Sequence, residues 1–284
     1  MLFTISFFKS RNLEKIDYAE LILYFEKELK CKITYGEEEV RMNYTDEVFD
    51  ITYSFLITKR SRVNNLALLN PEYVNIRFLI ELPLIIPEQV SREIFKVIEN
   101  ICLKFNFGVY YEGLDDIEHI DISKLMAQFL ILRSKELINY NEPIYYLENI
   151  VITHIANFHQ MFSYLKENYE DVTINKYKML TFTGSNEISL GIIWQLDTPT
   201  IIPPHLDYII IFDDGVHQFI PYNIFIKKTK RFFVELKTLI PDATLLYLNY
   251  KNCKKVSKIC RKMSKYYVHD KTFNNCEITN IIEK

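Results

Sequence analysis

Glycine is scarce in this chain, at six of 284 residues. Loops that cradle a phosphate or a dinucleotide need glycine, because it accepts positive φ and lets the backbone approach the ligand closely. No G-x-G-x-x-G motif occurs. Gly108 and Gly113 have the spacing of a P-loop, but Leu114 and Asp115 stand where that motif has a lysine and a hydroxyl residue. The sequence therefore excludes these phosphate-binding loops and implies no cofactor.

Cysteine is also sparse, and long apolar runs are absent. The five cysteines form no C-x-x-C pair and no short metal-ligand spacing, so we interpret them as free thiols in a reducing compartment. The start of the chain lacks the basic residues and small-residue cleavage site of a secretion signal. Glu81 and Pro83 interrupt the longest apolar stretch, which is shorter than a membrane span requires. These features predict a cytoplasmic protein with no membrane span.

The composition and length of the chain predict an ordered globular protein, and the order of its predicted elements places it in the α+β class. Hydrophobic residues make up 49% of the chain and charged residues 25%, and the formal net charge is only −3. Such a composition does not leave a chain disordered. A chain of 284 residues lies near the upper size limit for one core, so we expect two lobes, 1–141 and 142–284, with the break at Asn139–Pro143.

The first lobe is predicted to be a split-βαβ-like α/β sandwich. Phe3, Ile5 and Phe7 alternate with polar residues, as in a half-buried strand, and Asp17 then begins a helix with a capping-box pattern. A second helix follows Pro87, and a third is expected from Ile122 to Tyr140. Asp121 is the expected cap of that third helix. Further strands are predicted at Lys32–Tyr35, Val40–Tyr44, Phe49–Thr58, Tyr73–Leu82 and Phe107–Tyr111.

The second lobe is predicted to contain an antiparallel sheet flanked by helices. Its clearest signal is a hairpin, in which Asp214 and Gly215 separate two short apolar runs. Mixed apolar and polar residues favour a helix within Tyr145–Tyr164. Two more helices are expected, from Asn223 to Ile240 and from Asn252 to Tyr267.

The charge distribution is the feature of the sequence that most suggests a function. Between Phe225 and Lys271 there are 13 lysines and arginines against three acids, a balance of +10. On the last predicted helix, Lys254, Lys258, Arg261 and Lys265 are spaced by four, three and four residues, which aligns them along one face. We expect an amphipathic helix with a basic surface.

A basic face of this kind can meet an acidic protein, a nucleic acid or an anionic membrane. It can also be a solvated surface that keeps the domain soluble. The low pI of about 6.1 and the inward-facing aromatic residues of this region argue against nucleic acid. Against a membrane, the helix offers no bulky apolar wedge. An acidic protein, or the chain's own acidic lobe, is the favoured partner.

An acidic run offers an alternative, enzymatic interpretation. Asp115, Asp116, Glu118 and His119 lie close together in the sequence and could hold a divalent cation for hydrolase or nuclease chemistry. The run lacks the ligand spacing of an EF-hand loop, however, and its acids precede a predicted helix, where they stabilise the helix dipole.

Tryptophan and histidine give weaker signals. Trp194 is the single tryptophan and is either a core anchor or a partner contact. His154 and His159 are five residues apart, so a helix turns them to different faces, unlike the four-residue gap of a zinc site. No nucleophile signature occurs.

The sequence thus favours a non-enzymatic protein-binding protein, such as a regulator, adaptor or immunity-type inhibitor. A metal-dependent hydrolase or nuclease and a nucleic-acid-binding protein are the alternatives, and the partner and oligomeric state stay open.

Overall fold

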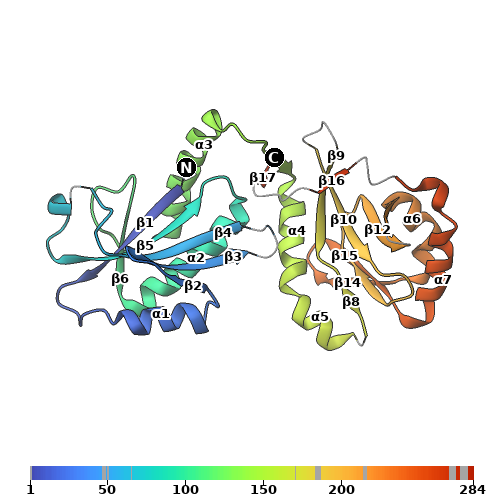
Figure 1. Ribbon diagram of the computed structural model, residues 1–284, viewed down its shortest axis with the longest axis horizontal. Helices are drawn as coiled ribbons and strands as arrows, with labels where there is room; N and C mark the ends of the chain where they lie inside the picture. Colours follow the sequence, from blue (N-terminus) through green and yellow to red (C-terminus); the bar gives the residue numbers. More distant parts are fainter. Residues whose placement is uncertain are drawn as a thin grey trace. The chain divides into compact units, whose positions relative to one another are not determined.

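The computed structural model describes residues 2–46, 49, 51–64, 66–169, 171–182, 187–213, 216–268, 273–275 and 281–284. Helices and antiparallel or mixed sheets alternate along the chain (Figure 1), which confirms the predicted α+β class. The chain divides into two compact units, Met1–Glu142 (unit 1) and Pro143–Lys284 (unit 2).

Unit 1 is built on a six-stranded antiparallel sheet. Its strands are β1 (Leu2–Ser10), β2 (Lys32–Tyr35), β3 (Glu39–Asp46), β4 (Ile51–Thr58), β5 (Tyr73–Pro83) and β6 (Phe107–Tyr111), in the order β2-β3-β4-β5-β1-β6. Strand β1 lies between β5 and β6 and is antiparallel to both. Because β5 and β6 therefore run the same way and α2 (Glu88–Phe105) connects them, the unit contains the predicted split βαβ arrangement.

Three helices cover one face of this sheet, and aromatic rings fill the space between. Phe3 of β1 packs edge-on against Phe95 of α2 and against Phe129 of α3 (Ile122–Asn139). Phe25 of α1 (Tyr18–Lys27) contacts Phe78 of β5 in the same way. All five rings are at most 2% exposed. These contacts form two groups, one that packs α1 on the sheet and one that packs α2 and α3 against β1.

The helix caps of unit 1 follow the sequence closely. The side chain of Asp17 accepts hydrogen bonds from the first turn of α1, and that of Asp121 does the same for α3. Pro87 immediately precedes α2, where its missing N–H costs nothing. Asn106 ends α2 in the left-handed conformation.

The opposite face of the sheet carries a closed set of ion pairs. Arg62 bridges Glu39 and Glu81, at 2.6 and 2.5 Å. Arg41 pairs with Glu39 at 2.7 Å. Glu81 is only 13% exposed, so its charge is balanced largely by protein groups.

Unit 2 contains two larger sheets. The first has the order β13-β12-β10-β9-β16 and the second β14-β15-β11-β8. The strands of the first are β9 (Tyr177–Phe182), β10 (Ile188–Trp194), β12 (Tyr208–Asp213), β13 (Val216–Pro221) and β16 (Phe273–Asn275). Those of the second are β8 (Thr173–Ile174), β11 (Thr200–Ile202), β14 (Val234–Ile240) and β15 (Ala243–Leu248). Each includes one parallel pair, β10 with β12 and β11 with β8, so both are mixed instead of purely antiparallel.

The remaining elements of unit 2 are mainly helical. They are β7 (Tyr145–Leu147), α4 (Asn149–Gln160), α5 (Phe162–Asn168), α6 (Tyr222–Thr229), α7 (Tyr250–Arg261) and β17 (Ile281–Glu283), with the short 3-10 turns η2 (Lys230–Phe232) and η3 (Ser264–Tyr266). A third 3-10 turn, η1 (Leu66–Leu68), belongs to unit 1. Strands β17 and β7 pair in parallel. The predicted hairpin is confirmed by the antiparallel pairing of β12 with β13, and its turn residues Asp214 and Gly215 lie outside the described residues.

The predicted bounds of two helices in unit 2 were wrong. The helix expected from Asn223 to Ile240 ends as α6 at Thr229, and its second half is strand β14. There Leu236 pairs with Leu245 of β15, a contact that helical spacing cannot reveal. The segment Tyr145–Tyr164 divides into β7, α4 and the start of α5, with a break at Met161.

Candidate functional site

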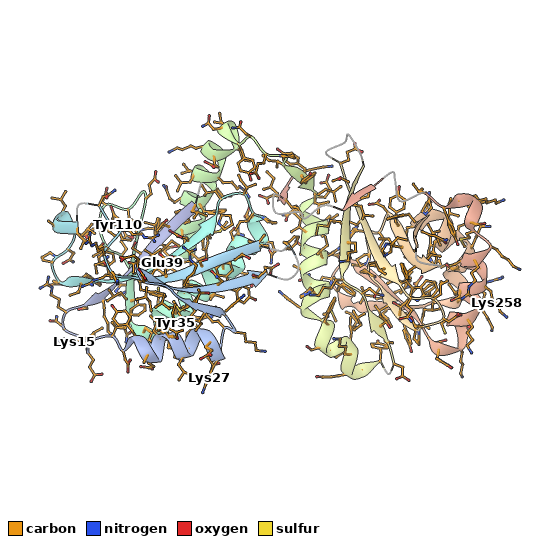
Figure 2. The ribbon with its side chains drawn as sticks, viewed as in Figure 1. Lys15, Lys27, Tyr35, Glu39, Tyr110 and Lys258 are labelled. Atoms are coloured by element: carbon orange, nitrogen blue, oxygen red, sulfur yellow. The ribbon has the colours of Figure 1, made fainter. Side chains whose placement is uncertain are left out.

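Helix α7 carries most of the predicted basic residues. Asn249 caps it by accepting a hydrogen bond from the backbone N–H of Asn252 at 3.2 Å. Its inward face is fully buried through Cys253, Val256 and Cys260. The lysines between these positions are consequently turned to the surface, and Figure 2 shows Lys258 projecting from α7 away from the sheets of its unit.

The four predicted contact residues do not form one continuous stripe. Lys254 and Lys258 are exposed on α7, as helical spacing requires. Arg261 lies on the same face but pairs with Asp197 at 2.9 Å, so its charge is compensated within unit 2. Lys265 lies beyond the end of α7, in η3, because the helix ends at Arg261 and not at Tyr267. The Lys265 ammonium lies 5.0 Å from the centre of the Tyr266 ring.

Asp197 attaches the loop after β10 to α7. Its backbone is left-handed, at φ 64°, and its N–H donates to the Ser257 hydroxyl at 2.7 Å. The Cys253 thiol donates to its carbonyl oxygen at 3.2 Å. The hydrogen bond from Arg261 lowers the pKa of the Asp197 carboxyl. Asp197 therefore holds one side of α7 in place, and its carboxylate compensates the charge of Arg261.

A basic groove lies on the other side of α7. We define it by its lining residues Lys227 and Lys228 of α6, Lys230 and Arg231 of η2, and Ile259 of α7, which enclose about 690 Å³. Lys255 and Lys262 come four residues before and three residues after Ile259 and are exposed, so they flank it on the same helix face. Cations from two helices thus converge around one aliphatic side chain.

The groove follows from the way α6 is held. Phe225 and Thr229 of this helix are fully buried, and the Thr229 hydroxyl donates to the Phe225 carbonyl at 2.7 Å. Since these two positions face the core, Lys227 and Lys228 lie on the exposed side. Sequence reasoning missed these groove residues, although the run Lys-Lys-Thr-Lys-Arg at 227–231 was a visible signal.

Few acids balance this charge. Glu235 pairs with Lys230 at 3.2 Å and with Lys237 at 3.1 Å, and hydrogen bonds from these two lysines lower the pKa of the Glu235 carboxyl. Among the residues that the structure describes, no ion pair joins Lys227 or Lys228 to an acid. Likewise, no acid of the described residues forms an ion pair with Lys255 or Lys258 of α7, or with Lys262 that follows it.

The aromatic rings near the groove are already covered by cations. The Lys228 ammonium lies 5.6 Å from the centre of the Tyr266 ring, on which Lys265 also packs. The Arg231 guanidinium lies 4.9 Å from the centre of the Phe232 ring. These contacts hold the cations in place and leave little ring surface for a stacked nucleobase.

Trp194 lies in the core and is not an exposed contact. It is fully buried, its ring packs against Phe225, and its indole N–H donates to the Thr198 carbonyl at 3.1 Å. Both ends of the side chain are satisfied by unit 2 itself. The partner-contact interpretation of Trp194 is therefore corrected, because no partner reaches a fully buried ring.

The acidic run of unit 1 has structural roles. The Asp116 carboxylate accepts hydrogen bonds from the backbone N–H groups of Asn70 and Ile117, at 2.8 and 2.7 Å. Glu118 pairs with Lys124 at 2.8 Å.

Asp115 and His119 are exposed, and the four predicted ligands are not brought together. Across the described ranges, no group of three His, Cys, Asp or Glu side chains is placed to hold a metal ion.

The cysteines of the described chain are buried thiols. Cys31, Cys102, Cys253 and Cys260 are free and buried, and burial raises the pKa of Cys102 and Cys260 to about 12. Cys276 lies outside the described residues.

One histidine contact was not predicted. His154 Nδ1 of α4 lies 2.7 Å from His205 Nε2, and the two rings stack. Burial, and secondarily the neighbouring His154, lower the pKa of His205.

Comparison with known proteins adds no assignment. No protein-family model, curated protein or solved structure matches the chain. Within the described residues, none of the helices is both long and apolar enough to cross a bilayer.

Proposed function

We propose that this chain is a binding protein that holds an acidic segment of a partner protein in the basic groove of unit 2. The observation that carries the proposal is the convergence of Lys227, Lys228 and Arg231 with Lys255 and Lys262 around Ile259, without a matching set of acids among the described residues. Cations held this close repel one another, and an anionic partner removes that repulsion.

The apolar residue in the groove favours a protein as this partner. Ile259 is half-buried between the cations, where it can contact a leucine or an aromatic side chain of an acidic segment. A phosphate backbone has no use for such a contact. Nucleic acid is disfavoured further because Lys265 and Arg231 pack on Tyr266 and Phe232, which leaves little of these rings free to stack on a base.

The test is direct binding of a short fluorescent peptide, composed of glutamates around a central leucine, to the full chain. Charge reversal at Lys228→Glu together with Lys255→Glu should weaken binding more than about tenfold, a loss of about 1.4 kcal/mol. Wild-type affinity should fall as salt is added, because the attraction is screened.

The matched control reverses two lysines of unit 1. Lys15 and Lys27 are exposed and project away from that unit (Figure 2), and Lys15→Glu with Lys27→Glu changes the net charge of the chain by the same amount. This control should change affinity less than about twofold, within the range of weak surface charges. Equal losses in both double variants would show that net charge, and not the groove, attracts the peptide. Tighter binding of oligothymidine than of the peptide would replace a protein partner with nucleic acid.

A further inference from the structure

Unit 1 has an incomplete strand edge, unrelated to the basic groove. Strand β6 pairs with β1 from Lys9↔Phe107 to Ile5↔Tyr111 and ends there. The first residues of β1, Leu2 to Thr4, pair with β5 on one side and have no strand of the described chain on the other. The main-chain N–H and C=O groups of successive strand residues point alternately to the two sides of the strand. At least one N–H and one C=O of this segment therefore point away from β5, where they offer a donor beside an acceptor.

A pocket of about 430 Å³ lies at this edge. Residues from four segments line it, including Thr4 and Ser6 of β1, Arg62 and Asn64 of the loop before β5, Tyr110 of β6, and Leu132 of α3. Its size falls in the range of small-molecule sites.

Several polar side chains of the pocket lack a protein partner. Ser6 is only 6% exposed, yet its hydroxyl has no hydrogen-bond partner among the described residues. Within the same set of residues, the polar side-chain atoms of Thr4, Asn64 and Tyr110 also have no such partner. None of these atoms is among the buried side-chain atoms of the described residues that lack a hydrogen bond, so they are open to the pocket, where a ligand can bind them in place of water.

The charges of the pocket argue against an anionic ligand. Arg62 is the lining cation, and both Glu39 and Glu81 already bind its guanidinium. Glu112 adds an exposed carboxylate to the lining. A phosphate here would meet a compensated cation and a free acid, whereas a neutral ligand with hydroxyl groups would find hydroxyl, amide and carboxylate partners.

Tyr110 supplies a flat wall. Its ring is partly exposed and is held edge-on by Phe8, at 6.4 Å between the ring centres. Phe8 belongs to a small core with Leu69 and Ile117, which keeps the tyrosine in position. A heteroaromatic ring can stack on such a surface.

From this combination we infer that the pocket of unit 1 binds a neutral nucleoside. Tyr110 stacks on the base, and the outward main-chain groups of β1 bind its donor–acceptor edge. Ser6, Thr4 and Glu112 bind the sugar hydroxyls.

The experiment measures binding of adenosine, guanosine, cytidine and uridine, one at a time, to the full chain by thermal shift and by saturation-transfer NMR. At least one nucleoside should raise the melting temperature and show saturation transfer, since a ligand of the folded state stabilises it by mass action. The corresponding nucleoside monophosphate should bind more weakly. No response to any of the four nucleosides, or tighter binding of the monophosphate, would overturn the inference.

Two variants locate the site. Ser6→Ala removes a hydroxyl that has no described protein partner, so it should leave the melting temperature of the free protein unchanged or raised while weakening the nucleoside about fivefold or more. Tyr110→Leu should weaken it similarly, and if this variant fails to fold, Ser6→Ala decides alone. The control is Tyr35→Leu, an exposed tyrosine of β2 at the other edge of the sheet (Figure 2), which should have no effect. Nucleoside binding that is the same in Ser6→Ala as in wild type would place the ligand elsewhere.

Discussion

The two units arrange their charges in opposite ways. Unit 1 contains 17 Lys and Arg against 23 Asp and Glu, a net charge of −6. On the face of its sheet opposite the helices, Arg41, Glu39, Arg62 and Glu81 form a closed set of ion pairs in which the charges alternate in sign. Unit 2 contains 17 basic against 14 acidic residues, a net charge of +3, and gathers cations on α6, η2 and α7.

This difference follows from the geometry of strands and helices. On a strand, residues two apart share one face, so Glu39 and Arg41 of β3 lie side by side, and Arg62 of the loop between β4 and β5 reaches both Glu39 and Glu81 of β5. On a helix, lysines at spacings of three and four residues share one face and cannot pair among themselves. The network of unit 1 therefore serves its own fold, whereas the cations of unit 2 are available to an external anion. The predictions that follow test this contrast.

The largest effect is expected from the core beneath the basic groove. Trp194 is fully buried against Phe225, the residue that holds α6 in place. Trp194→Ala should lower the free energy of unfolding by about 3–5 kcal/mol through the cavity it leaves. It should also weaken binding of the acidic peptide, because α6 carries one wall of the groove. Urea unfolding followed by circular dichroism measures the first effect, with Trp194→Phe as the milder control. A loss below about 1 kcal/mol would contradict the anchoring role.

The next largest effect tests the closed network of unit 1. Glu81→Ala removes a nearly buried carboxylate from Arg62 and should cost about 1.5–3 kcal/mol, the range for hydrogen bonds to charged groups. The comparison variant is Glu38→Ala, which breaks the exposed pair with Lys59 and should cost less than about 1 kcal/mol. If both variants lose equally little in urea unfolding, the network of unit 1 is as dispensable as an ordinary surface pair.

The elements that the sequence predicted correctly are those whose causes are local. Helix α3 begins after Asp121 because the side chain of that residue binds the first-turn amides, and a reader of the sequence can recognise such a cap. Helix α2 has a strong apolar stripe behind Pro87. The split βαβ order was also recoverable, since it needs only the sequence of elements and the rule that helices cover a sheet.

The missed features depend on contacts distant in the chain. Strand β14 was assigned to a helix because its pairing with β15 is invisible in a local pattern. The ion pair of Arg261 with Asp197 joins residues that are 64 positions apart in the chain, and the contact of His154 with His205 joins residues that are 51 positions apart. The basic groove required the packing of α6 beside α7, so its cations could be counted in the sequence but not placed.

A smaller effect is expected from the histidine pair of unit 2. Because the pKa of His205 is lowered in the folded state, the unfolded chain binds a proton more readily than the folded one near pH 6. The stability contribution is complete above the ordinary histidine pKa of about 6.5 and is lost as the pH falls below it. Urea unfolding monitored by the fluorescence of Trp194, the single tryptophan, should show a lower midpoint at acidic pH. His205→Gln should flatten this dependence, and an unchanged slope would assign it to other groups.

The smallest effect separates stability from surface charge within unit 2. Asp197→Asn removes the charge of the pair with Arg261 while keeping the main-chain bonds of residue 197 to Ser257 and Cys253, so the loss of stability should stay below about 1 kcal/mol. The variant thereby removes the negative charge that Asp197 places beside Arg261 of α7.

Binding of the acidic peptide should therefore strengthen, by less than about fivefold, or about 1 kcal/mol. The gain should disappear at high salt. Since Arg261 lowers the pKa of Asp197, the ion pair stabilises the wild type above the ordinary carboxyl pKa and is lost only as the pH falls through the lowered value. At neutral pH, then, the ion pair is present in the wild type and absent from the variant. Weaker peptide binding by the variant would mean that Asp197 shapes α7 more than it screens its charge.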